Sequence, residues 1–263
     1  MSGIIDFHTH AFPDSIAGKV VQNLSSYYGA EITNSGTLGE LLRQKDAAGI
    51  GCCVVHTAAT KPEQVIPANK WAVSMQGAGE VAFGTIHPDF PQLEEQLDFL
   101  EEMGLVGIKI HPELQGFSID AEKLFPVYEL IDRRFIVLVH LGKAWQQKND
   151  WASPKRLARL LKQFPRLKVV GAHLGGFLMW DEADCLIGQD CYLDTSSVIG
   201  YLPEERVVQL IRAHGAERVV FGSDYPMHSL DQALKGFLSL PLTDREKEMI
   251  LTQNAERILG GSW

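Results

Sequence analysis

Two histidines separated by one residue close the first apolar run of the chain, in the segment Asp6-Phe7-His8-Thr9-His10. The β-branched residues before them predict a β-strand, in which every second side chain points to the same face. We therefore expect His8 and His10 to project side by side, with Phe7 and Thr9 facing the other way. Two imidazoles held in this way can bind a divalent metal ion. Such a pair also occurs in surface loops, so a metal site needs support from elsewhere in the chain.

Short apolar runs recur along the chain, and most of them end in a residue that can bind a metal ion. Eight runs lie at residues 4–10, 52–56, 81–86, 106–111, 135–140, 168–173, 191–195 and 219–224. Six of these runs carry such residues at their ends: His8 and His10, His56, His111, His140, His173 and Asp224. Stretches with a helical spacing of apolar residues separate the runs, which is typical of βα units and a parallel sheet.

The number and order of the runs predict an α/β fold, a (β/α)8 TIM barrel formed as a single domain over residues 1–263. The segment at about residues 11–36 is longer than the first connection of a barrel requires, and its apolar spacing predicts a helical insertion over the barrel mouth. The carboxyl ends of barrel strands meet at one face, where active sites are built. We therefore expect the histidines and Asp224 to converge at that face.

The composition argues against several classes of partner. Hydrophobic residues make up 45% and charged residues 22% of the chain, as in an ordinary globular protein. The formal net charge of −9 and the lack of a basic run argue against binding to nucleic acid or to a membrane surface. The sequence has no signal-peptide pattern, so we expect a cytoplasmic protein that binds a small molecule. A homodimer is the default expectation from the frequency of twofold assemblies.

Several motifs follow the predicted strands in a set order. They are Ile5-Asp6-Phe7-His8-Thr9-His10-Ala11-Phe12-Pro13, Gly107-Ile108-Lys109-Ile110-His111-Pro112, Val139-His140, Gly171-Ala172-His173-Leu174-Gly175-Gly176, Gly222-Ser223-Asp224-Tyr225-Pro226 and Asn254-Ala255. Together these motifs span nearly the whole chain. In their residues and their order the sequence resembles the amidohydrolase superfamily, specifically its compact branch of TIM-barrel metal-dependent hydrolases that also contains the aminocarboxymuconate-semialdehyde decarboxylase type.

The resemblance implies a metal centre whose ligands are His8, His10, His140 and Asp224. It also implies that His173 is either a further ligand or a proton-transfer residue beside the metal. Imidazole and carboxylate ligands suit Zn²⁺, with Mn²⁺ or Fe²⁺ as alternatives, and we favour one ion over two. We expect a metal-activated water, Asp224 as the general base that takes its proton, and His173 as a group that stabilises an oxyanion or shuttles a proton.

Lys109 shares the predicted inward parity of His111 on the fourth run. In binuclear members of the superfamily a lysine on the fourth strand is carbamylated and bridges two metals. The motif here also resembles that of mononuclear members, and we favour Lys109 as an unmodified cation that orients the substrate. The remaining alternative is a structural lysine that pairs with a carboxylate such as Asp6.

Three further histidines are candidate substrate contacts. His56 and His111 end predicted strands, where each can touch the substrate or donate a hydrogen bond that supports a metal ligand. His228 follows Asp224 in the next loop, close to the expected metal.

Two reactions fit this predicted site. The first is hydrolysis of a small amide, ester or lactone by the metal-activated water. The second is non-oxidative decarboxylation of a small unsaturated or aromatic carboxylic acid. An arginine would hold the departing carboxylate, but every arginine falls in a predicted helix or at its end, so the sequence favours hydrolysis. A non-enzymatic metal-binding protein is the third alternative, and an open set of histidines and carboxylate argues against it.

Overall fold

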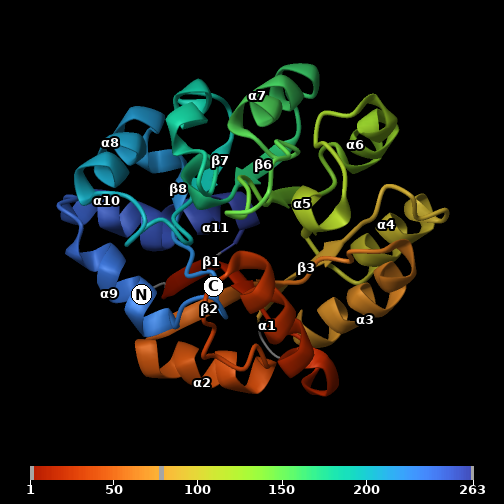
Figure 1. Cartoon of the computed structure of the whole chain (residues 1–263), viewed down its shortest axis with the longest axis horizontal. Helices are drawn as coiled ribbons and strands as arrows, with labels where there is room; N and C mark the ends of the chain where they lie inside the picture. The colour runs from red at the N-terminus through yellow and green to blue at the C-terminus, as the bar shows by residue number, and fades with distance from the viewer. Residues whose placement is uncertain (1–2, 77–79, 262–263) are drawn as a thin grey trace.

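Eight parallel strands lie side by side in chain order in the computed structural model of the chain (Figure 1). The structure describes residues 3–76 and 80–261, so residues 1–2, 77–79 and 262–263 of the predicted domain lie outside the described residues. The strands are β1 (Ile4–His10), β2 (Ile50–His56), β3 (Val81–Thr85), β4 (Gly107–Ile110), β5 (Ile136–Val139), β6 (Lys168–Gly171), β7 (Tyr192–Asp194) and β8 (Val219–Val220).

The sheet closes into a barrel through backbone hydrogen bonds between β1 and the segment after β8. The amide of Phe7 donates to the carbonyl of Phe221 at 2.8 Å, and the amide of Asp224 donates to the carbonyl of His8 at 2.8 Å. β8 ends at Val220, earlier than the predicted run 219–224, although the segment after it stays bonded to β1. Asp224 in this segment has a φ of 65°. The predicted (β/α)8 TIM barrel is confirmed.

Helices surround the strands (Figure 1). They are α1 (Asp14–Tyr28), α2 (Leu38–Ala48), α3 (Val65–Gln76), α4 (Leu93–Glu102), α5 (Pro112–Gln115), α6 (Phe125–Ile131), α7 (Pro154–Gln163), α8 (Glu204–His214), α9 (Leu230–Ser239), α10 (Asp244–Glu248) and α11 (Asn254–Leu259). The side chains of Thr37, Ser153 and Thr243 cap α2, α7 and α10 by accepting an amide hydrogen from three residues on. Within residues 3–76 and 80–261, no helix combines the length and the apolar character needed to cross a membrane.

Apolar side chains fill the barrel between the amino ends of the strands, so the barrel is a packed core there. Ile5 and Phe7 of β1 meet Phe83 of β3 in this core, and α11 covers it. The rings of Phe7 and Phe83 contact edge to face with centroids 5.8 Å apart. Gly107 lies against the ring of Phe83, where a Cβ atom would come within 2.4 Å of ring carbons, so a larger residue does not fit.

A β-bulge in β1 changes the side-chain alternation that the sequence predicted. The register against β2 pairs Asp6 with Cys53 and Thr9 with Val55, so three steps along β1 correspond to two along β2. Phe7 therefore packs inside the barrel, and our prediction that it faces the opposite side from His8 is wrong. The bulge inserts an extra residue and turns His8 to the same interior as Phe7.

Asn254 ties α11 to the barrel. Its buried Nδ2 donates to the carbonyl oxygens of Ala216 and Val219 at 2.8 and 2.7 Å. Asn254→Ala leaves both buried carbonyls without this donor, so we expect the free energy of unfolding to fall by about 2–4 kcal/mol. Denaturant unfolding measures this loss, with Gln253→Ala at the exposed neighbouring position as the control. Equal stability of the two variants would contradict the assignment.

Candidate metal centre

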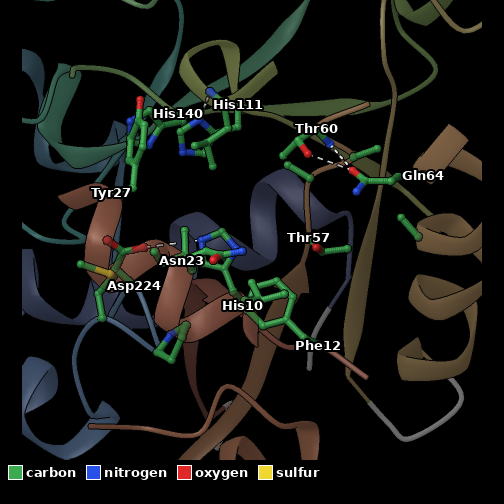
Figure 2. Close-up of a pocket in the computed structure, with 18 of the residues that line it drawn as sticks. His10, Phe12, Asn23, Tyr27, Thr57, Thr60, Gln64, His111, His140 and Asp224 are labelled. Carbon is green, nitrogen blue, oxygen red and sulfur yellow. Dashed lines mark hydrogen bonds and ion pairs between the residues drawn. The ribbon is translucent and has the colours of Figure 1, made fainter. Parts of the chain in front are cut away.

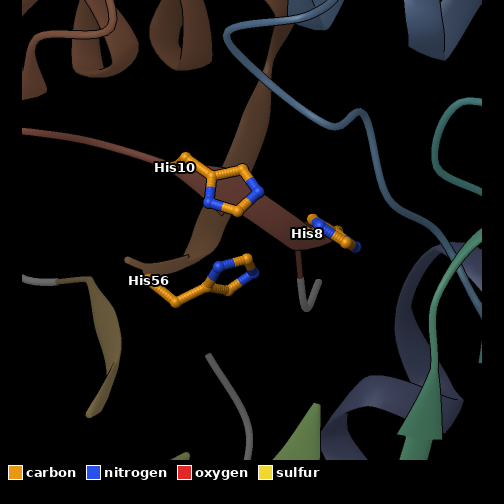
Figure 3. Close-up of side chains that lie close together, drawn as sticks. All are labelled: His8, His10 and His56. Carbon is orange, nitrogen blue, oxygen red and sulfur yellow. The ribbon is translucent and has the colours of Figure 1, made fainter. Parts of the chain in front are cut away.

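Three histidines from two adjacent strands form a cluster at the carboxyl end of the barrel (Figure 3). His8 and His10 come from β1 and His56 ends β2, and one ring nitrogen of each lies within 4.8 Å of the others. The backbone pairing of His10 with His56 places these two side chains next to each other. The structure thus brings the predicted pair His8 and His10 together, and it adds His56 to the same cluster.

Asp224 reaches this cluster from the segment after β8. Its Oδ1 lies 3.4 Å from Nε2 of His8 and 3.6 Å from Nε2 of His10. The positive φ of Asp224 and the bond from its amide to the carbonyl of His8 fix the direction of the side chain. The hydroxyl of Ser197 donates to Oδ2, the other carboxylate oxygen. Asp224 therefore presents Oδ1 to the histidines.

Asp194, at the end of β7, orients His8. Nδ1 of His8 lies 2.7 Å from Oδ2 of Asp194, and the backbone amides of His173 and Ser196 donate to its Oδ1. Because an ionised carboxylate only accepts, Nδ1 of His8 carries the proton and Nε2 keeps its lone pair. Asp194 was not among the predicted site residues, although it lies within the predicted run 191–195.

His140 and His173 form a second hydrogen-bonded pair. Nδ1 of His173 lies 2.9 Å from the carbonyl of Ser196, which only accepts, so this nitrogen carries the proton. Nε2 of His173 is then the acceptor for Nδ1 of His140, 3.1 Å away. His140 is left with a buried Nε2 that has no partner among the described residues. In this arrangement His173 orients His140, and His140 presents a free lone pair.

The donor set fits a divalent metal ion. Buried polar atoms are normally paired, yet both ring nitrogens of His56 and Nε2 of His140 have no partner within the described part of the chain. Four ligands held about 2.1 Å from an ion in a tetrahedron lie about 3.4 Å apart. The 3.4 and 3.6 Å separations between Asp224 and the Nε2 atoms of His8 and His10 agree with that spacing.

Burial keeps these imidazoles neutral, which is the form that binds metal. It lowers the pKa of His8 to about 4, and it lowers the pKa values of His56 and His140 well below the usual range. Burial would raise the pKa of Asp224, but the neighbouring His8 and His10 side chains outweigh burial and hold that pKa well below its ordinary value. The site therefore combines neutral imidazoles with an ionised carboxylate.

Lys109 lies inside the barrel beside His8. Its Nζ is 3.1 Å from Nε2 of His8, and its side chain is completely buried. Burial lowers the pKa of Lys109 to about 7, partly opposed by Asp194 and Asp224. Lys109 is not among the described residues that line the cavity of about 460 Å³ beside the histidine cluster. Lys109 therefore lies beside a candidate metal ligand, and its predicted role in orienting the substrate stays a prediction.

A cavity of about 460 Å³, here called the main cavity, opens beside the cluster (Figure 2). His10, His111, His140, His173 and Asp224 line its inner end. Most of its other walls are apolar, and they come from α1, α3 and the loops that follow β2, β6 and β8. Helix α1 belongs to the segment predicted as an insertion, and one of its faces covers the cavity.

The other predicted substrate contacts occupy different places. His111 lines the main cavity, where Nε2 bonds to the hydroxyl of Tyr28 at 3.0 Å and the ring stacks on His140 at 3.8 Å. His56 is absent from the described lining of that cavity. His228 instead lines a smaller cavity of about 140 Å³, and its Nε2 lies 3.1 Å from Oγ of Ser197. His228 therefore reaches Asp224 through Ser197.

The fold and the site together define a TIM barrel with a candidate metal centre at the carboxyl ends of its strands. The sequence matches the amidohydrolase family over residues 5–261, so the chain belongs to this family of enzymes.

A named relative matches part of the chain. A gamma-resorcylate decarboxylase from Polaromonas sp. strain JS666 is 22% identical over 212 residues, which cover 60% of this chain and 63% of that protein. The match thus spans less than two thirds of the relative's length.

Solved structures share the fold. An uncharacterised TIM-barrel protein from Bordetella bronchiseptica superposes with a TM-score of 0.81 at 20% identity, over 98% of each chain. A dihydroxybenzoic acid decarboxylase from Polaromonas sp. JS666, with bound manganese and the inhibitor 2-nitroresorcinol, gives a TM-score of 0.73 at 17% identity. That superposition covers 99% of this chain and 97% of the other.

Asp194 offers a direct test of the hydrogen bond that orients His8. Asp194→Asn removes the charge that holds the proton on Nδ1, so we expect metal affinity to fall by about 10–100-fold. Titration against a competing chelator measures the affinity, and Asp190→Asn at a nearby exposed position serves as the control. Unchanged affinity in Asp194→Asn would show that His8 does not depend on this partner.

Proposed function

We propose that the protein is a metal-dependent, non-oxidative decarboxylase of a small aromatic or unsaturated carboxylic acid. The proposal rests on one observation: the histidine cluster lies at a largely apolar cavity, with Phe12, Trp71 and Phe177 in its walls. A planar apolar ring suits these walls, and a carboxylate suits the cluster. The relatives support the same reaction, because two of those named above are decarboxylases of aromatic acids.

The proposal assigns one divalent ion to His8, His10, His140 and Asp224, with His56 beside them as a further candidate ligand. The manganese bound in the dihydroxybenzoic acid decarboxylase favours Mn²⁺ over the Zn²⁺ that the residue types suggested. A divalent ion held there supplies Lewis acidity toward substrate oxygen atoms.

In the proposed reaction the bond between the ring and the carboxylate carbon breaks, and CO₂ leaves. The ring carbon keeps the electron pair and takes a proton. Asp224 lines the cavity and is ionised, so it can accept the proton of a substrate hydroxyl and return it to that carbon. A hydroxybenzoate then gives a phenolate and CO₂, with atoms and charge in balance. His173 orients His140 and is the second candidate for moving a proton, since it also lines the cavity.

Hydrolysis of an amide, ester or lactone, which the sequence analysis favoured, has less support. That preference rested on the lack of an arginine at the strand ends, and indeed no described residue in the lining of the main cavity is Arg or Lys. A carboxylate can bind to the metal ion instead, so decarboxylation does not require an arginine. The names of the relatives favour decarboxylation over hydrolysis.

A substrate panel separates the two reactions. Protein loaded with Mn²⁺ is incubated with hydroxybenzoates and, separately, with small amides, esters and lactones. We expect at least one hydroxybenzoate to yield equal amounts of CO₂ and the ring product, with activity lost on chelation and restored by the metal. The products are measured by chromatography and CO₂ trapping. Hydrolysis of the second set with no CO₂ from the first would contradict the proposal.

Asp224 is the residue whose replacement affects the proposed chemistry most directly. Asp224→Asn keeps the size of the side chain but removes the proton acceptor, so we expect kcat to fall by about 10²–10⁴-fold. Elemental analysis of the same sample separates lost metal from lost proton transfer. The exposed Asp181, replaced as Asp181→Asn, is the matched control. Full activity in Asp224→Asn would remove this residue from the mechanism.

A further inference from the structure

We propose that the outer half of the main cavity is a binding subsite for an uncharged, apolar substituent of the substrate. This inference rests on the proposed function, since the cluster would hold the carboxylate end of the same molecule. It narrows the substrate class to aromatic or unsaturated acids that carry an apolar extension and no second charge.

The size of the main cavity exceeds what one ring needs. Its volume is about 460 Å³, whereas a cavity of about 150 Å³ in another protein is enough to bind benzene. The main cavity is thus about three times as large as that benzene site. A simple benzoate bound at the metal cluster would leave most of the cavity filled with water, and this water would contact apolar walls. A larger apolar ligand removes that contact with water, which is favourable.

One wall of the subsite is an apolar stripe on α1. Ile16, Val20 and Leu24 follow one another at intervals of four residues, so they share one face of the helix, and all three line the cavity. Ile16 is 47% exposed, although an amphipathic helix usually buries such a stripe. Among the described residues, no neighbour covers Ile16 fully, and the stripe faces the cavity.

The facing wall is also apolar, and it is fixed in place. Pro67, Ala68 and Trp71 of α3 line the cavity. The indole Nε1 of Trp71 donates to the carbonyl of Ala11 at 3.0 Å, which holds the ring against the chain that leads into α1. A ligand between α1 and α3 would contact aliphatic and aromatic surface on both sides.

The charges in the cavity lie at one end only. Asp224 is the only Asp or Glu among the described lining residues, and it belongs to the metal cluster. At the other side of the pocket Figure 2 shows Thr57, Thr60 and Gln64. The side-chain oxygen of Gln64 already accepts from the amides of Thr60 and Lys61. This region thus offers no charge to bind a second carboxylate or an ammonium group.

Binding of substituted benzoates tests the subsite without turnover. The ligands are benzoates with a methyl to butyl chain at position 3 or 4, titrated calorimetrically into the Mn²⁺-loaded protein. Each buried methylene should tighten binding about fourfold, so butyl should exceed methyl by roughly 60-fold at the better position. Benzoates with a second carboxylate at that position should bind more weakly than benzoate. Affinity that is flat with chain length, or higher for the dicarboxylates, would overturn the proposal.

Two variants locate the effect. Val20→Asp places a charge on the stripe, and Leu24→Ala removes apolar surface without adding one, so both should lower the ratio of butyl to methyl affinity. Gln22→Asp, at an exposed position on the same helix, should keep the ratio. Circular dichroism checks that each variant is folded. A ratio that stays unchanged in folded Val20→Asp and Leu24→Ala would place the alkyl chain elsewhere and overturn the assignment.

The test of the subsite and the test of the proposed decarboxylase activity can fail independently. A rising alkyl series together with no CO₂ release from the hydroxybenzoate panel would keep the subsite and reject the decarboxylase. CO₂ release with a flat series would keep the decarboxylase and reject the subsite. If the alkyl series is flat, the apolar face of α1 needs another partner. Burial of Ile16 in a dimer contact would then show that a second copy of the chain packs against this face.

Discussion

The hydrogen bond between His8 and Asp194 is the interaction on which the site depends. It joins β1 to β7 across the carboxyl end of the barrel, and both side chains are fully buried. Because Asp194 also accepts from the amides of His173 and Ser196, it fixes the start of the turn that presents the His140–His173 pair. One carboxylate therefore sets the protonated nitrogen of His8 and anchors the neighbouring histidines. Burial then keeps the imidazoles neutral, which is the protonation state that binds a metal ion.

Much of the fold could be predicted from sequence because the apolar runs, the helical stretches between them and their order along the chain all indicate the same barrel. The eight apolar runs became the eight strands, and Thr37 and Thr243, both of a residue type favoured at helix starts, cap α2 and α10. Strand order also predicted that five residues converge on one face of the barrel: His8, His10, His140, His173 and Asp224. Alternation within a regular strand predicted the wrong side for Phe7, however, since a bulge depends on pairing with β2 and leaves no mark in the sequence of β1.

The remaining parts of the site depend on contacts between distant segments. Asp194 stands 186 residues from His8, and a single sequence does not reveal that they bond. As expected, three further residues lie at or near the carboxyl ends of strands: His56, Lys109 and His228. Only the packing of the side chains decides whether each one faces the main cavity. The cavity likewise depends on how α1 lies over the barrel. Tyr28 of α1 bonds to His111, whose ring stacks on His140, so the helix that covers the cavity is tied to a candidate ligand.

The metal content per chain tests the central claim most directly. The measurement is elemental analysis of the purified protein after dialysis, without added metal, compared with the double variant His8→Ala/His140→Ala. The account predicts close to one manganese or zinc ion per wild-type chain and almost none in the variant. Two ions per chain would contradict the single-ion site and make Lys109 a bridging carbamate. No ion, or equal content in both proteins, would contradict a metal centre at these residues.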